Sequence, residues 1–156
     1  MSDTASARLP RTPAQHYCRV VGVVLLLAGL IGFVAEGSFS SGDTLERGSL
    51  LGLDVNGWHN LVHVASGLLL LAAANTRPTA KTVAIGVGFT YALVTLWGLI
   101  DGEDILGVIP VNGPDNVLHL VLAAAGIALG MMSPTTGRAQ RRRLDRDGEP
   151  APTERS

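Results

Sequence analysis

Two pairs of polar side chains stand out in a chain that is otherwise strongly apolar. In each pair an asparagine is followed three residues later by a histidine: Asn60 with His63, and Asn116 with His119. A spacing of three places both side chains on one helix face. Carboxamide and imidazole groups can join membrane helices by hydrogen bonds, and imidazole also binds metals and titrates near neutral pH. The pairs therefore mark where this chain could tie helices together, hold a bound group or move a proton.

Both pairs belong to a repeated segment. The sequence VNGWHNLVH of residues 55–63 returns as VNGPDNVLH at residues 111–119. In each copy an Asn-Gly dipeptide precedes an apolar stretch, and asparagine is favoured at the N-cap of a helix. We expect helix-start turns at Asn56, Gly57, Asn112 and Gly113. The repetition predicts two tandem helical hairpins, each with one Asn-x-x-His pair at the same depth.

The chain contains four apolar blocks of 17–19 residues each. A helix needs about 20 apolar residues to cross the hydrocarbon core of a bilayer, and a lipid-exposed backbone must satisfy its own hydrogen bonds. We therefore predict an all-α fold, an integral membrane four-helix bundle built from two tandem parallel hairpin repeats. The expected helices cover about residues 17–35, 58–74, 83–100 and 116–132 of a domain at 17–132.

The segments outside this domain are polar. Residues 1–16 are expected to form a disordered cytoplasmic arm and residues 133–156 a disordered basic cytoplasmic tail, because they bury too little apolar surface to fold alone. In the turn at residues 75–81, Pro78 is expected to stop the second helix. Anionic lipid of the inner leaflet can attract each basic side chain of the tail by about 1 kcal/mol. These side chains include Arg141, Arg142 and Arg143.

Basic residues are distributed unevenly along the chain. Of the 12 lysines and arginines, all but Arg47 lie in or beside the N-terminal arm, in the loop between the second and third helices, or in the tail. By the positive-inside rule both termini are cytoplasmic, which predicts a multi-pass protein of the cell membrane. Acidic residues gather in the other two loops, so the net charge of −1 conceals this polarity. A nucleic-acid partner is not supported.

We favour a non-enzymatic role for the two pairs, in which their side chains brace the outer half of the bundle. Each hydrogen bond between membrane helices contributes about 0.6–2 kcal/mol. The four bracing side chains are Asn60, His63, Asn116 and His119. The lipid bilayer is the expected partner. The part of the bundle braced by these side chains could also bind another membrane protein or a second copy of this chain. No cofactor is needed for this role, and the sequence has no nucleophile–base pair or phosphate-binding loop that would indicate an enzyme.

Three alternatives use the same histidines. The first is a divalent metal site, and zinc would require about four ligands in tetrahedral geometry. Its candidate ligands are His63 and His119, with Glu36, Asp101 or His59. The second is a haem between His63 and His119, with one axial ligand from each hairpin. The third is a proton or small-solute pathway that depends on histidine titration. His59 taken alone is expected to be a surface residue at the junction of loop and helix.

Two longer stretches resemble a known family. The first is NGWHNLVH followed by ASGL, at residues 56–63 and 65–68. The second combines LWGLI at 96–100, LGVIPVNG at 106–113 and DNVLH at 115–119. They resemble the small four-span bacterial membrane proteins, common in actinobacteria, of domain of unknown function 4383. The resemblance implies a four-helix integral membrane protein with no established activity, and it assigns no catalytic residue.

Overall fold

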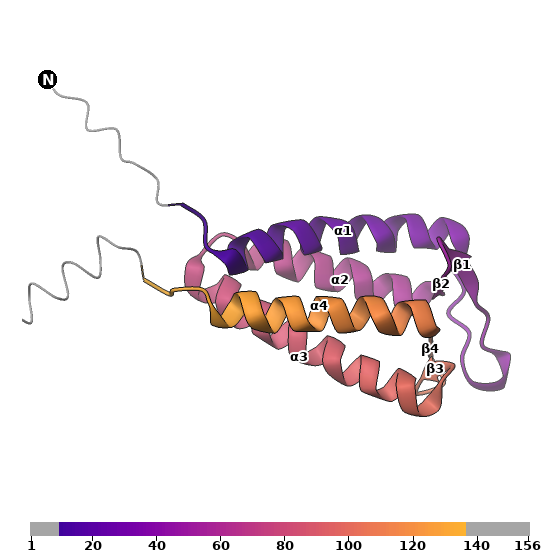
Figure 1. Cartoon of the computed structure of the whole chain (residues 1–156). Helices are drawn as coiled ribbons and strands as arrows, with labels where there is room; N and C mark the ends of the chain where they lie inside the picture. Colours follow the sequence, from indigo (N-terminus) through magenta and orange to yellow (C-terminus); the bar gives the residue numbers. More distant parts are fainter. Residues whose placement is uncertain (1–9, 137–156) are drawn as a thin grey trace, which may run out of the picture.

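A computed structural model of the chain describes residues 10–136. Four helices run side by side, and the described ends of the chain lie together at one end of the bundle (Figure 1). The helices are α1 (Pro13–Ala35), α2 (Gly57–Ala73), α3 (Arg77–Asp101) and α4 (Gly113–Met131). The protein is thus predominantly helical, as the sequence predicted.

Helices α1 and α3 begin earlier than expected because each has a threonine cap. Thr12 accepts a hydrogen bond from the Gln15 N–H, and the Gln15 side chain accepts one from the Thr12 N–H, which completes a capping box. Residues 13–16, expected in a disordered arm, are therefore helical. Pro78 does not stop α2. It lies in the first turn of α3 behind the cap Thr76, where a missing N–H breaks no intrahelical bond.

The domain also ends later than expected. Ser133, which we had placed at the start of the tail, is only 2% exposed. Its Oγ accepts a hydrogen bond from the Ala14 N–H and donates one to the Leu129 carbonyl, both at 2.7 Å. Ser133 therefore ties the end of α4 to the start of α1. The expected tail residues Arg141, Arg142 and Arg143 lie outside the described residues, as do residues 1–9.

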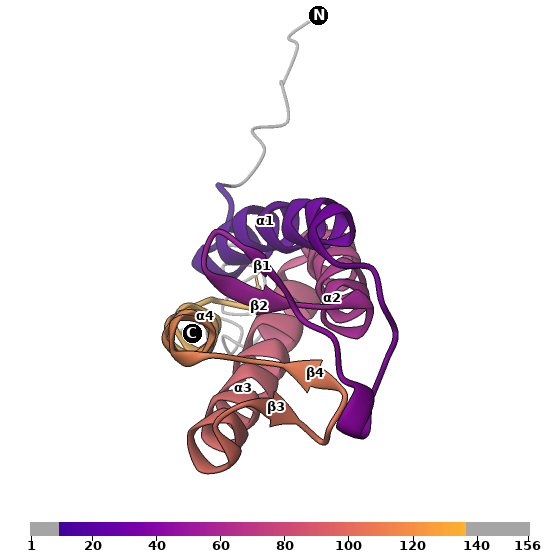
Figure 2. The ribbon, with the colours of Figure 1, turned by 90° about the vertical axis from the view of Figure 1, so that its right-hand side faces the viewer.

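The expectation of an all-α fold was incomplete, because both loops opposite the chain ends contain a small β-hairpin. Strands β1 (Gly48–Leu50) and β2 (Leu53–Val55) pair antiparallel, as do β3 (Asp104–Ile105) and β4 (Ile109–Pro110). A short 3₁₀ helix, η1 (Gly42–Thr44), precedes β1. Between β1 and β2, Leu51 and Gly52 have φ angles of 56° and 88°, and two positive φ angles are what a type I′ hairpin turn requires. Figure 2 shows both β-hairpins lying across this end of the bundle.

Small residues bring the helices of each hairpin close together. A Cβ atom added to Gly67 of α2 would lie 2.8 Å from the Gly22 carbonyl oxygen of α1. In the second hairpin, a Cβ on Gly88 of α3 would lie 3.0 Å from the Ala123 carbonyl oxygen of α4. Membrane helices commonly associate in this way, because lipid provides little hydrophobic force to press larger side chains together.

The large apolar side chains face outward instead. Helices α1, α3 and α4 are long and apolar enough to cross a membrane, whereas α2 is an apolar helix of 17 residues. Their exposed side chains include Val20, Val24, Leu27, Phe89, Leu93, Leu96, Leu120 and Val121. Glycine, alanine, asparagine and histidine occupy much of the interior. Monomers that face water rarely expose so much contiguous apolar surface, so the pattern supports a membrane location.

Candidate metal centre

The two asparagines of the Asn-x-x-His pairs face inward within their own helical hairpins. Asn60 on α2 donates a hydrogen bond from Nδ2 to the Glu36 carbonyl at the end of α1, at 2.8 Å. Its side chain packs directly against Gly32, a position that has no room for a Cβ atom. Asn116 on α4 packs in the same way against Gly98 on α3. Both asparagines are less than 10% exposed and join the two helices of one hairpin.

The histidines of the pairs face a different neighbour. Residues three apart on a helix differ in direction by about 60°, which is enough to separate their contacts. His63 and His119 point between the hairpins, where their ring centroids are 6.4 Å apart. From the spacing of three we expected both side chains of a pair on one helix face. The structure instead divides each pair, with asparagine inside a hairpin and histidine between the hairpins.

A third histidine completes this cluster. One nitrogen from each of His59, His63 and His119 lies within 4.8 Å of the other two. The ring centroid of His59 is 4.4 Å from that of His63 and 6.0 Å from that of His119. All three side chains are buried, with exposed fractions of 2%, 6% and 3%. Two helices from different hairpins thus present three imidazoles to one point.

The expectation that His59 is a surface residue was wrong. The backbone of Asp54 in β2 and of Pro110 in β4 lies beside its ring, so the β-hairpins cover it. The sequence did contain a signal for its participation, because His59 and His63 are four residues apart and four residues make about one helical turn. The Asn-x-x-His spacing of three does not include His59, so that motif alone does not predict its participation.

Two nitrogens of the cluster are buried without a partner. Within the described residues, Nδ1 of His59 and Nδ1 of His119 form no hydrogen bond. Leaving a buried polar atom unsatisfied costs about 1–3 kcal/mol. A neutral imidazole offers one lone pair, which a cation can bind directly. The unpaired nitrogens are consistent with a site that receives an ion.

The acidic residues proposed as further ligands do not reach this cluster. Glu36 accepts a hydrogen bond from the Ser38 N–H at 2.8 Å, and Asp101 accepts one from the Trp97 indole at 3.1 Å on the exposed end of α3. Among the described residues, the histidines, cysteines and acids close enough to share an ion are His59, His63 and His119. The donor set is therefore three imidazoles and no carboxylate.

A cavity of about 260 Å³ borders the histidine cluster. Its walls come mainly from α2 and α3, and Ile105 and Ile109 of the second β-hairpin also line it. All three histidines contribute to its lining, together with Tyr91, whose ring centroid is 5.1 Å from that of His119. A ligand in this cavity would contact the cluster directly.

Residues 15–132 match the family model described as a domain of unknown function, DUF4383. The chain belongs to this family. The DUF4383 match covers most of α1, all of the other three helices and all three clustered histidines. No curated protein and no solved structure matched the chain. The family description names no activity.

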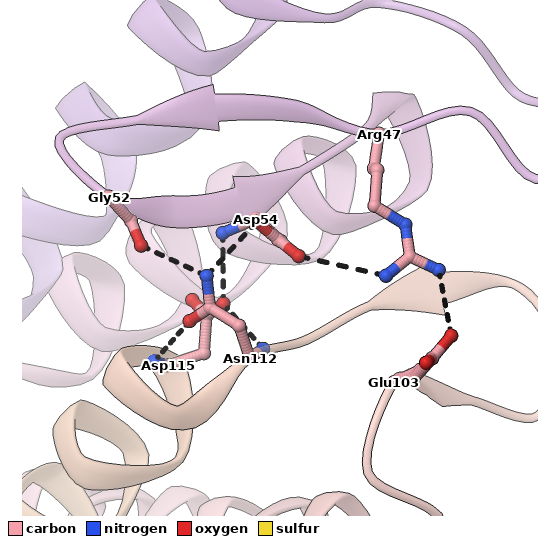
Figure 3. A network of polar contacts seen from close by, with 6 residues as sticks. All are labelled: Arg47, Gly52, Asp54, Glu103, Asn112 and Asp115. Carbon is pink, nitrogen blue, oxygen red and sulfur yellow. Dashed lines mark hydrogen bonds and ion pairs between the residues drawn. The ribbon is translucent and has the colours of Figure 1, made fainter.

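In this DUF4383 protein the two loops that contain the β-hairpins contact each other through a network of polar side chains (Figure 3). Asp115, 1% exposed at the start of α4, accepts hydrogen bonds from the N–H groups of Asp54 at 2.9 Å and Asn112 at 3.0 Å. Asn112 donates from its side chain to the Gly52 carbonyl and to the Asp54 carboxylate, at 2.9 Å and 3.0 Å. These bonds join the first loop to the start of α4, which holds α2 and α4 in register.

Arg47 extends this contact across the surface. Its guanidinium lies 3.8 Å from the Asp54 carboxylate and 3.7 Å from that of Glu103 in the second loop (Figure 3). Asn56, the N-cap of α2, donates to the Val108 carbonyl of the second loop at 2.8 Å. The N-cap residues Asn56 and Asn112 thus have two roles, because each caps its own helix and also donates a hydrogen bond to the loop of the other hairpin. Loop contacts made by the caps position the helix turns that carry the histidines.

Proposed function

We propose that this DUF4383 protein is a four-span membrane protein that binds a divalent transition-metal ion through His59, His63 and His119. One observation carries the proposal: three buried imidazoles from two hairpins present nitrogens within 4.8 Å of one another, and two of these rings have an unpartnered Nδ1. We propose binding as the role and assign no reaction to the ion.

The chemistry of the donor set favours zinc or copper. Imidazole nitrogen is a good ligand for both ions, and three histidines with one open position form a known zinc arrangement. Zinc–nitrogen bonds of about 2.0–2.1 Å place tetrahedral ligand atoms roughly 3.4 Å apart. The nitrogens here lie within 4.8 Å, so small side-chain rotations would close the site. The nearby Asp54 carboxylate supplies negative charge that partly offsets the charge of the ion.

The same geometry favours a single ion over a haem. A haem between His63 and His119 would need a flat slot separating the two rings. His59 packs close to both of them, at centroid distances of 4.4 Å and 6.0 Å. A small cation needs only small rotations of the three converging rings.

We further propose that Asn60 and Asn116 brace the two hairpins, and that these hairpins are an internal repeat. Support comes from the repeated motif and from the matching contacts of Asn60 with Gly32 and Asn116 with Gly98. We place both termini in the cytoplasm, since basic residues gather at that end and the described chain ends lie together (Figure 1). The metal site then lies in the outer half of the membrane.

Elemental analysis of the detergent-purified protein tests the metal proposal. We expect zinc or copper close to one ion per chain, and its loss in the His63→Ala/His119→Ala variant. His16→Ala is the matched control, because His16 is an exposed histidine on α1 remote from the cluster. Circular dichroism and size-exclusion chromatography of all three proteins would show whether the variants keep the helical content and the size of the wild type. No bound metal in the wild type after incubation with either ion would overturn the proposal and leave the bracing role.

A further inference from the structure

We infer that the cavity beside the histidines binds the ring of a lipid-soluble quinone that arrives from the bilayer between α2 and α3. The inference rests on the membrane location in the proposed function and does not depend on the metal.

The cavity opens on the lipid-facing side of the bundle. Val62 and Leu69 of α2 line it and are 45% and 51% exposed, and Thr90 of α3 is exposed on the opposite rim. From their common turn, α2 and α3 diverge toward the β-hairpins (Figures 1 and 2). In a bilayer this side faces acyl chains. A ligand dissolved in lipid therefore reaches the cavity without crossing water.

The inner wall carries hydrogen-bonding groups that an acyl chain cannot satisfy. The Tyr91 side chain is 6% exposed and lines the cavity, and its hydroxyl forms no well-aligned hydrogen bond, although Ser66 is nearby. Thr90 is already satisfied, since its hydroxyl donates to the Gly86 carbonyl at 3.1 Å. Tyr91 is thus a buried donor in need of an acceptor, and the His63 imidazole is a second polar group on the same wall.

The size of the cavity limits the ligand. Drug-sized molecules occupy pockets of about 300–1,000 Å³, and this cavity of about 260 Å³ lies just below that range. One or two fused rings would fill it, and a longer tail would have to extend through the opening into lipid. Apolar walls from valine, leucine and isoleucine suit the faces of such a ring. A quinone combines a flat apolar ring, carbonyl acceptors and a lipid-soluble tail.

Binding can be measured with a decyl-tailed benzoquinone added to the full-length protein in phosphatidylcholine nanodiscs. Quenching of Trp58 and Trp97 fluorescence would report binding, with empty nanodiscs as the correction for partitioning. We expect saturable quenching in the wild type. Tyr91→Phe should weaken binding about two- to tenfold, the effect of one lost hydrogen bond. Saturable quenching that Tyr91→Phe leaves unchanged would overturn the assigned anchor and with it the inference.

A filled cavity provides the second test. Ser66→Leu adds bulk inside the cavity and should abolish saturable quenching, whereas Ala65→Leu adds the same side chain at an exposed neighbouring position and should not. Equal quinone binding by the Ser66→Leu and Ala65→Leu variants would overturn the inference. Displacement of the quinone by decanol, at concentrations equal to those of a competing quinone, would also overturn it, because it would show that the tail alone is recognised. Metal content separates it from the proposed function. Metal without quinone binding refutes this inference alone, and quinone binding without metal refutes the metal proposal alone.

Discussion

The rings of His59 and His63 contact each other one helical turn apart on α2, with centroids 4.4 Å apart and ring planes inclined by 63°. His59 also lies beside the second hairpin, where its ring centroid is 6.0 Å from that of His119. A residue at the first turn of a helix thereby becomes part of a buried cluster. His59 is also the clustered histidine that lies outside the Asn-x-x-His pairs, so it tests the metal site independently of the bracing role.

Replacing His59 with alanine should weaken zinc binding by more than the 10–100-fold that follows loss of an outer-shell partner, because it removes one of three donors. Competition with a coloured chelator in detergent would measure the change. The His16→Ala variant should bind zinc as the wild type does. An unchanged affinity in His59→Ala would show that His59 is not a ligand.

Replacing Asn60 with alanine should destabilise the protein without removing the metal. The change deletes the 2.8 Å hydrogen bond to the Glu36 carbonyl, and such bonds in membranes contribute about 0.6–2 kcal/mol. Asn75→Ala is the control, because Asn75 is exposed and its side chain donates to the Ala72 carbonyl at the end of its own helix. Thermal unfolding in detergent would rank the variants. Loss of metal together with an unchanged midpoint in Asn60→Ala would contradict the division of roles between asparagine and histidine.

Gly32→Ala should be more damaging than Gly86→Ala. A Cβ atom at Gly32 would collide with the Asn60 side chain, whereas a Cβ atom at Gly86 has no neighbour within 4 Å. Overpacking costs about 1–3 kcal/mol, while alanine is up to about 1 kcal/mol better than glycine inside a helix. The midpoint of thermal unfolding should therefore fall for Gly32→Ala and stay or rise for Gly86→Ala. Equal midpoints would mean that α1 and α2 are not held this closely.

In the loop network, Asp115→Ala should destabilise the protein far more than Arg47→Ala. Asp115 is buried, and its removal leaves the N–H groups of Asp54 and Asn112 without their acceptor. Each unsatisfied buried donor lowers the free energy of unfolding by about 1–3 kcal/mol. The Arg47 side chain is 37% exposed, and surface ion pairs contribute about 0–1 kcal/mol. Denaturant titration of both variants would give the ranking. The reverse order would show that the surface ion pairs hold the loops together.

The proposed orientation predicts which loops an impermeant maleimide can reach in intact cells. The single cysteine, Cys18, is buried and can be replaced by alanine to give a background without thiols. In that background Ser41→Cys should be labelled from outside, and Asn75→Cys should be labelled only after the cells are opened. Both positions are exposed in the structure. The opposite labelling pattern would invert the topology and place the metal site in the inner half.

Features set by neighbouring residues could be predicted from the sequence. The apolar blocks predicted the helices, and the two Asn-Gly dipeptides predicted the turns at which α2 and α4 begin. These features depend on hydrogen bonds and solvation within one or two helical turns. The errors at Pro78 and at residues 13–16 were also local, because threonine caps and first-turn prolines were present and were not read as helix starts.

The site depended on contacts between distant parts of the chain. The sequence alone determined that Asn60 and His63 would share a helix, but only the tertiary structure decided that they face different partners. It also decided that β2 and β4 cover His59 and that Asp115 joins the two outer loops. The physical reason is that a helical period fixes the angle between two side chains and not the neighbour that each one meets. That neighbour is set by the packing of α1 on α2 and of one hairpin on the other.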